Sequence, residues 1–168
     1  MGNFVSFYDE QGFVPVRQNI DGDNRQKHFN RRESLYRMLG IPGALVKGAD
    51  VLEFGPGSGD NAMFTDSLSP AKYKLVEGAE GGFNAINDKK IKGAFSSSSE
   101  VIIEKKIIED YFDDETYDLV LCEGLIPGQQ YPEKILRKVA SYVRPGGVLV
   151  ITTATYASLL SDIMRRVL

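Results

Sequence analysis

Residues 51–61, with the sequence VLEFGPGSGDN, constrain this chain more than any other segment. An apolar run typical of a buried strand leads into a turn with glycine at three alternate positions, Gly55, Gly57 and Gly59. Glycine adopts positive φ angles readily and has no Cβ to hold a ligand away from the backbone. The segment therefore predicts a strand, a turn and a helix start, with the turn lying against a nucleotide-type ligand.

The spacing of these glycines narrows the choice of ligand. A dinucleotide-binding turn, G-x-G-x-x-G, would place its third glycine at position 60, where this chain has Asp60. A carboxylate at a helix N-terminus competes with a bound phosphate, and a P-loop would need lysine followed by serine or threonine. The turn therefore favours a ligand without phosphate groups.

Length and charge limit the remaining choices. A chain of 168 residues predicts one globular unit. Its formal net charge of −3 provides no general attraction to nucleic acid or to an anionic membrane surface, so a small-molecule partner is expected. No apolar run approaches the roughly 18 residues of a membrane span. The single cysteine, Cys122, excludes an internal disulfide and a cysteine-rich zinc site, which fits a cytoplasmic protein without a metal.

Short apolar runs alternate with longer amphipathic ones after residue 48. The runs predict strands at 51–54, 74–77, 101–104, 117–123 and 148–153. Helices are predicted between them at 61–68, 82–91 and 132–143, the last ended by the turn residues 144–147. This alternation predicts an α/β fold with a doubly wound, mainly parallel sheet, whose ligand binds beyond the carboxyl ends of the strands.

Residues 1–47 are expected to form an N-terminal cap segment and a helix leading into the ligand-binding domain at 48–168. Residues 1–23 carry turn signals and aromatic side chains, which predicts an irregular segment docked on the domain. Apolar spacing predicts a helix at 24–39. We expect a solvated face for its basic residues, or alternatively a contact with an acidic substrate; they are His28, Arg25, Lys27, Arg31, Arg32 and Arg37.

Four segments together resemble the class I S-adenosylmethionine-dependent methyltransferases. They are VLEFGPGSG at 51–59, the acidic strand end at Glu77, YDLVL at 117–121 and RPGGVLVIT at 144–152. The resemblance implies a Rossmann-like sheet, S-adenosyl-L-methionine as cofactor, and methyl transfer to an oxygen, nitrogen or carbon nucleophile of a small-molecule or sugar-type acceptor.

Such enzymes normally add a C-terminal hairpin of two further strands, whereas residues 158–168 are helix-like. The chain is therefore expected to be part of a longer protein, or to have its fifth-strand edge covered by its last helix, a second subunit or a further domain.

The resemblance also assigns cofactor-binding roles. Glu77 follows Gly59 by 18 residues, near the roughly 20-residue spacing of ribose-binding carboxylates, and would accept from ribose hydroxyls. Glu53 would face the methionine end and Ala79 the adenine ring. As alternatives, Glu77 could be a solvated strand end and Glu53 a salt-bridge partner of a neighbouring helix. The predicted set is Glu53, Gly55, Pro56, Gly57, Gly59, Glu77, Gly78, Ala79, Ile107, Cys122 and Glu123.

The third strand departs from the family pattern. The family usually has an acidic residue for the adenine amino group about a dozen residues before the YDLV motif, where this chain has Lys106. Lysine cannot accept a hydrogen bond from an amine. The backbone of Ile107, or the side chain of Glu109 or Asp110, would take that role. The acidic run 110–115 is otherwise expected to be a solvated loop.

Glu123 is the candidate for steering the acceptor or taking its proton, with a purely structural carboxylate as the alternative. Cys122 is expected to be a small buried hydrophobe. The sequence CEGL at 122–125 lacks the N/D-P-P-Y signature of adenine or glutamine N-methylation. Two other functions stay open: a non-catalytic module that binds the cofactor or a partner, and a nicotinamide-dependent oxidoreductase.

Overall fold

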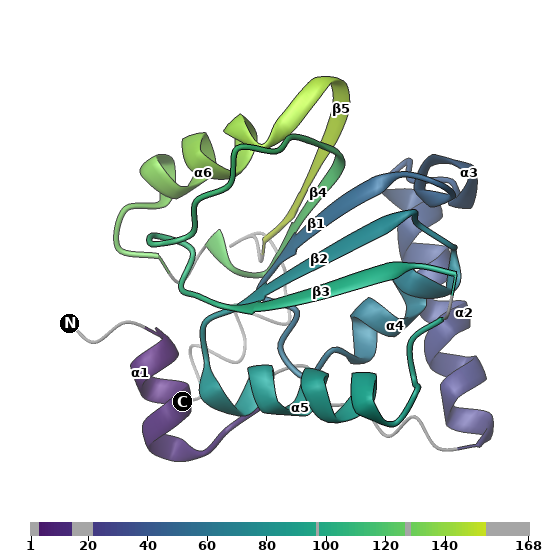
Figure 1. Cartoon of the computed structure of the whole chain (residues 1–168), viewed down its shortest axis with the longest axis horizontal. Coiled ribbons are helices and arrows are strands. Elements are labelled where there is room, and N and C mark those ends of the chain that lie inside the picture. The colour runs from purple at the N-terminus through teal and green to yellow at the C-terminus, as the bar shows by residue number, and fades with distance from the viewer. Residues whose placement is uncertain (1–3, 15–21, 97, 127–128, 154–168) are drawn as a thin grey trace, which may run out of the picture.

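The computed structural model describes residues 4–14, 22–96, 98–126 and 129–153. Five parallel strands form one sheet in the order β3-β2-β1-β4-β5 (Figure 1). The strands are β1 Asp50–Phe54, β2 Lys72–Glu77, β3 Glu100–Lys105, β4 Tyr117–Glu123 and β5 Val143–Thr152. The helices are α1 Phe4–Gln11, α2 Asp23–Met38, α3 Gly43–Val46, α4 Asp60–Ser67, α5 Glu80–Ile91 and α6 Pro132–Ser141. The predicted α/β fold is confirmed.

Helices cover both faces of the sheet, with α2, α4 and α5 on one side and α6 on the other (Figure 1). Two hydrophobic clusters fill the two interfaces. Successive residues of β1 alternate between them, since Val51 belongs to the first cluster whereas Leu52 and Phe54 belong to the second. This alternation of fully buried side chains explains why β1 reads as a continuous apolar run.

The strand order places the topological switch point between β1 and β4. From β1 the chain passes outward to β2 and β3, and then returns to the other side of β1 to form β4 and β5. Connections running in opposite directions leave a crevice at the carboxyl ends of β1 and β4. The geometry therefore selects this end of the sheet for ligand binding.

Residues 4–11 form helix α1, so the prediction of an irregular segment is wrong. The N–H of Glu80 at the start of α5 donates to the carboxylate of Asp9 at 2.8 Å. Gly12, with φ +59°, follows the helix, and the N–H of Phe13 donates to the carbonyl of Tyr8. Because an eight-residue helix is marginal alone, its contacts with α5 stabilise it.

The predicted turn at 144–147 lies inside β5, which is a second correction. The pairing of β5 with β4 jumps from Tyr117–Val143 to Leu119–Val148, so the intervening residues form an irregularity in a continuous strand. Arg144 fixes it through ion pairs of 2.9 Å with Asp50 and with Asp118. Residues 154–168 lie outside the described residues, and the expectations for the C-terminal segment lie there with them.

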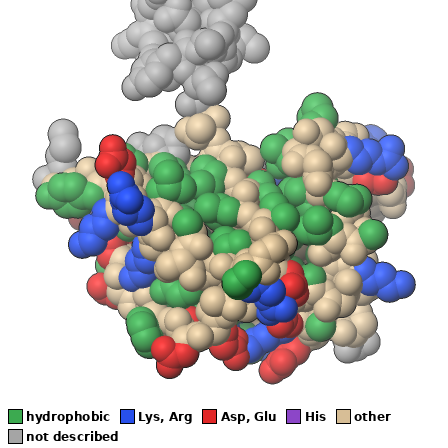
Figure 2. Space-filling view, turned by 90° about the horizontal axis from the view of Figure 1, so that it is seen from above, with side chains coloured by type: hydrophobic (Ala, Val, Ile, Leu, Met, Phe, Trp, Pro, Cys, Tyr) green, Lys and Arg blue, Asp and Glu red, His purple; other side chains and the backbone are tan. Residues whose placement is uncertain are grey.

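Strand β5 forms the uppermost edge of the sheet in Figure 1, and Figure 2 looks onto the molecule from that side. Hydrophobic side chains gather across the middle of this face, with charged side chains toward its lower border. Among the described strands, β5 pairs only with β4. Cover by a second subunit or a further domain stays a prediction. No helix in the described part of the chain is long and apolar enough to cross a membrane.

Candidate functional site

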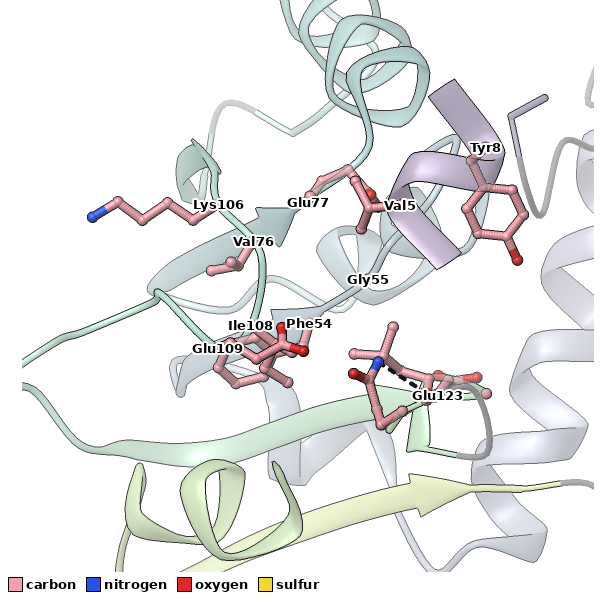
Figure 3. Close-up of a pocket in the computed structure, with 14 residues that line it drawn as sticks. Val5, Tyr8, Phe54, Gly55, Val76, Glu77, Lys106, Ile108, Glu109 and Glu123 are labelled. Carbon is pink, nitrogen blue, oxygen red and sulfur yellow. Dashed lines mark hydrogen bonds between the residues drawn. The ribbon is translucent and has the colours of Figure 1, made fainter. Parts of the chain in front are cut away.

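A cavity of about 190 Å³ opens at the carboxyl ends of the strands, at the predicted switch point (Figure 3). Its walls come from the ends of β1, β2 and β4, from the segment after β3, and from helix α1. The lining residues are Val5, Tyr8, Phe54, Gly55, Val76, Glu77, Gly78, Lys106, Ile108, Glu109, Glu123, Gly124, Leu125 and Gln129.

The glycine turn between β1 and α4 has the backbone conformation that its sequence predicts. Gly55, Gly57 and Gly59 have φ angles of +69°, +60° and +78°, in the left-handed region that favours glycine. A Cβ at Gly59 would lie 3.0 Å from Cγ1 of Ile86 on α5. Of the three glycines, Gly55 lines the cavity, whereas the buried Gly57 and Gly59 shape the turn beneath it. Pro56 is likewise buried and does not line the cavity.

Glu77 connects the ends of β1 and β2. Its Oε2 accepts from the N–H of Gly57 and its Oε1 accepts from the N–H of Ala79, both at 2.8 Å. Burial raises the pKa of Glu77 although these backbone donors oppose the shift. A Cβ at Gly82 would lie 2.9 Å from Cδ of Glu77, so a glycine in α5 makes room for the carboxylate. The pair of glycines at 81–82 is the sequence signal for this contact.

Gly78 lies directly beneath α1. A Cβ there would lie 3.0 Å from methyl groups of Val5 and Ile107, so only glycine allows both side chains to approach. Ala79 is buried at the N-cap of α5 and does not line the cavity. Ile107 contacts Gly78, whereas Ile108 is the residue that lines the cavity.

Lys106 and Glu109 both line the cavity rim, but their side chains lie differently. Figure 3 shows the Lys106 ammonium pointing away from the other lining side chains, whereas the Glu109 side chain points toward them. Asp110 does not line the cavity. Of the two acidic side chains considered for the adenine amino group, Glu109 is therefore the one at the cavity.

Glu123 at the end of β4 is held by Arg32 of α2. The guanidinium donates twice, from Nη1 to Oε2 at 2.8 Å and from Nη2 to Oε1 at 2.5 Å. The expected solvated face of α2 is wrong for Arg32 and His28, which are both buried. With Tyr36 they form a stripe with helical i, i+4 spacing that packs inward.

The other basic residues of α2 are exposed as predicted: Arg25, Lys27, Arg31 and Arg37. His28 donates from Nε2 to the carbonyl of Asp60 at 3.3 Å, and burial lowers the pKa of its imidazole. The sole histidine therefore joins α2 to the start of α4.

Glu53, which is buried inside β1, lies beside the ion pair of Arg32 and Glu123. The hydroxyl of Tyr73 donates to it, as a buried carboxylate requires. Burial, aided by the nearby charge of Glu123, raises the pKa of Glu53 to about 7, while Tyr73 and Arg32 oppose the shift. Nε of Arg32 is buried without a hydrogen-bond partner among the described residues. The transfer end, defined as Glu53, Arg32 and Glu123, therefore holds two carboxyl groups and one cation. Of the three, Glu123 lines the cavity, whereas Glu53 and Arg32 are buried behind it.

Cys122, a predicted cofactor-binding residue, and Asp60, the carboxylate of the glycine turn, do not line the cavity. Cys122 is buried in the core cluster on the α6 face, and burial raises the pKa of its thiol to about 12, so it is a neutral small hydrophobe. Asp60 accepts from the Ser58 hydroxyl at 2.8 Å and pairs with Lys89 of α5 at 3.2 Å. Its carboxylate is buried and does not line the cavity, so it acts within the turn and not on a ligand.

A family model described as a methyltransferase domain matches residues 24–166. The chain therefore belongs to the methyltransferase-domain family, which confirms the family resemblance predicted from its motifs. Helix α1 lies outside the matched range. No curated protein matches the sequence.

Solved structures share the fold at low sequence identity. Magnesium protoporphyrin IX methyltransferase from Synechocystis PCC 6803, with bound SAH (S-adenosylhomocysteine), has a TM-score of 0.70 at 14% identity, covering 97% of this chain and 76% of that one. Coclaurine N-methyltransferase, bound to N-methylheliamine and SAH, has a TM-score of 0.62 at 17% identity, covering 82% and 38%. The [4+2]-cyclase SpnF has a TM-score of 0.67 at 14% identity, covering 93% and 62%. This chain thus spans well under two thirds of the coclaurine enzyme.

Proposed function

We propose that this chain binds S-adenosylmethionine in the cavity and transfers its methyl group to an oxygen, nitrogen or carbon nucleophile of a small-molecule or sugar-type acceptor. The observation that carries the proposal is the Glu77 carboxylate, fixed by the N–H groups of Gly57 and Ala79 at the edge of the cavity. Family membership and the SAH bound in two related structures support the same cofactor.

The groups around Glu77 fit an unphosphorylated ribose. Each carboxylate oxygen has used one acceptor position on a backbone N–H, which leaves further lone pairs for two hydroxyl donors. A 2′-phosphate would be repelled by the same buried charge. Gly55 and Gly78 line the same cavity. An unphosphorylated adenosine ribose therefore fits this end better than the 2′-phosphorylated ribose of NADP, and the comparisons give the oxidoreductase no support.

We assign the adenine amino group to Glu109. Its carboxylate can accept from the exocyclic amine, whereas Lys106 can only donate. Phe54 and Ile108 supply apolar surface at the same part of the cavity. The assignment replaces the backbone of Ile107, since that residue contacts Gly78 and does not line the cavity.

The transfer end suits the methionine moiety of the cofactor. Glu53 and Arg32 are buried and do not line the cavity, so their charges would act on the ammonium and carboxylate groups of that moiety from behind Glu123, which does line it. When bound, the cofactor supplies a methyl group already activated on a sulfonium sulfur. The residues of this chain then have to align the acceptor and exclude water. Glu123, with both oxygens on Arg32, is suited to orienting an acceptor hydroxyl or amine and is a poor base.

Calorimetric titration with S-adenosylmethionine and S-adenosylhomocysteine tests the proposal. We expect micromolar dissociation constants, and about tenfold weaker binding of S-inosylhomocysteine, whose 6-oxo group cannot donate to Glu109. Glu109→Gln should reduce that preference, because an amide can donate to the oxo group. Glu133→Gln, exposed in the first turn of α6 and outside the cavity lining, is the matched control. Absence of binding to correctly folded protein would overturn the proposal.

A cofactor- or partner-binding module without turnover is the second candidate. The ion pair between Glu123 and Arg32 favours it, because it leaves no uncompensated base at the end of β4. Incubation with methyl-labelled cofactor and a panel of phenols, amines and sugars separates the two. Cofactor binding without any labelled product would favour the module, whereas one labelled acceptor would exclude it.

A further inference from the structure

A second buried polar cluster lies on the α6 face of the sheet, away from the glycine turn. At its centre is Lys74, in the middle of β2, whose side chain is 10% exposed. Its Nζ lies 2.5 Å from Oδ2 of Asp113, between β3 and β4, and 3.6 Å from Oε1 of Glu104 on β3. A lysine buried on an inner strand of the sheet is unfavourable without such partners. Asp113 thus compensates a charge that the sheet itself buries.

Asp113 also accepts hydrogen bonds from three further donors. Its Oδ2 accepts from the hydroxyls of Tyr111 at 2.7 Å and Tyr117 at 2.6 Å, and its Oδ1 accepts from the N–H of Glu115 at 3.0 Å. Burial alone would raise the pKa of Asp113, but the bonds from Lys74, Tyr117 and Tyr111 outweigh it and hold the pKa well below its usual range. The expected solvated loop is therefore wrong for Asp113.

Tyr111 connects this cluster to the cofactor cavity. Its ring centroid lies 5.2 Å from that of Phe54, which lines the cavity. Its backbone N–H donates to the carbonyl of Ile107 at 3.1 Å, which closes the turn that contains Ile108 and Glu109. The hydroxyl of Tyr142 donates to the carbonyl of Tyr111 at 3.1 Å. Tyr111 therefore joins the charged cluster and the cavity wall through its side chain, and the turn through its backbone.

We propose that Asp113 is a positioning residue for the adenine end of the cavity. It holds the hydroxyl of Tyr111 and the charge of Lys74, and thereby fixes the turn that places Ile108 and Glu109 at the cavity. It does not line the cavity itself. The inference rests on the proposed function, because it needs adenosine to bind between Glu77 and Glu109.

Titration with S-adenosylhomocysteine provides the test. Asp113→Asn keeps the shape of the side chain but turns an amide toward Lys74 or a tyrosine hydroxyl, and we expect about tenfold weaker binding. Asp114→Asn makes the same chemical change at the exposed neighbouring position and should leave binding unchanged. Asp113→Asn should also narrow the preference for S-adenosylhomocysteine over S-inosylhomocysteine, which a uniform loss of stability would not alter.

Tyr111→Phe is the second variant, because it keeps the ring against Phe54 and removes only the hydroxyl. We expect it to bind S-adenosylhomocysteine about threefold more weakly than the wild type. If Asp113→Asn fails to fold, this variant provides the test of the inference. Equal affinity of the wild type and the folded variants for S-adenosylhomocysteine would overturn the inference and leave the proposed function intact. Failure of the folded wild type to bind would overturn both.

Discussion

The two ends of the cavity hold their carboxylates by different means. At the ribose end, Glu77 accepts from the backbone N–H groups of Gly57 and Ala79, which belong to the turns that follow β1 and β2. At the transfer end, Glu123 lies on the guanidinium of Arg32, 91 positions away in the sequence, and Glu53 lies on the hydroxyl of Tyr73. Backbone N–H groups hold the carboxylate of the ribose end, whereas side chains hold the carboxyl groups of the transfer end.

This difference separates what each end depends on. Backbone donors cannot be removed by substitution, so the ribose end depends on the shape of the glycine turn and on space beside Gly82. The transfer end depends on a charge balance that α2 supplies from outside the sheet, through Arg32. We therefore expect the transfer end to be sensitive to lost charge and to pH, and the ribose end to be sensitive to added bulk.

Removing the cation at the transfer end should have the largest effect. Arg32→Met leaves Glu123 and the buried Glu53 without their positive partner, and we expect the free energy of unfolding to fall by about 4 kcal/mol. Urea denaturation followed by circular dichroism measures it. Arg31→Met, at the exposed neighbouring position, should change it little. Similar losses in the two variants would show that the ion pair does not stabilise this end.

Adding one methyl group to the glycine turn comes next. Gly59→Ala forces a side chain into a φ of +78° and places its Cβ 3.0 Å from Ile86. We expect a loss of about 3 kcal/mol, part from backbone strain and part from overpacking. Gly93→Ala has a similar φ of +68° with nothing within 4 Å, so it reports the strain alone. If Gly59→Ala and Gly93→Ala lowered the free energy of unfolding equally, overpacking against Ile86 would not contribute to the loss.

The raised pKa of Glu53 predicts a pH dependence of the free energy of unfolding at the transfer end. Below about pH 4.5 the carboxyl is protonated in the folded and unfolded chain alike. Between there and its folded pKa of about 7, only the unfolded chain ionises, so stability falls as pH rises. We expect the wild type to lose about 2 kcal/mol more than Glu53→Gln between pH 5 and pH 8. Parallel pH profiles from urea denaturation would contradict this.

Neutralising the ribose-end carboxylate should cost least in stability. In Glu77→Gln the amide oxygen can serve only one of the two N–H groups, and we expect a loss of about 1 kcal/mol. Glu80→Gln, three residues on and exposed, is the matched control. Thermal denaturation of both variants measures the difference. A loss as large as that of Arg32→Met would show that the two ends do not differ as described.

The ribose end could be predicted from sequence because its contacts are local. Alternating apolar runs and the spacing of Gly55, Gly57 and Gly59 predict the strands, the turn and the position of Glu77 at a strand end. At the transfer end Glu53 and Glu123 were predicted, but Arg32 was not, because a basic helix gives no sign of which arginine side chain is buried. The i, i+4 spacing of His28, Arg32 and Tyr36 is the only sequence signal that this face of α2 is buried. It is a weak signal, because two of the three residues are polar.

Two backbone features also could not be predicted from the local sequence. Helix α1 forms where the turn signals predict an irregular segment, because its stability comes from docking over Gly78 and against Glu80. The segment 144–147 looks like a turn, yet Arg144 anchors it within β5. In both places a tertiary contact outweighs the preference of the local sequence.

The most direct test is the crystal structure of this chain with S-adenosylhomocysteine. We expect the ribose hydroxyls on Glu77, the adenine amino group on Glu109, and the homocysteine end directed toward Glu53 and Arg32. A ligand bound elsewhere, or in the cavity with its two ends exchanged, would contradict the assignment of a backbone-built ribose end and a charge-built transfer end.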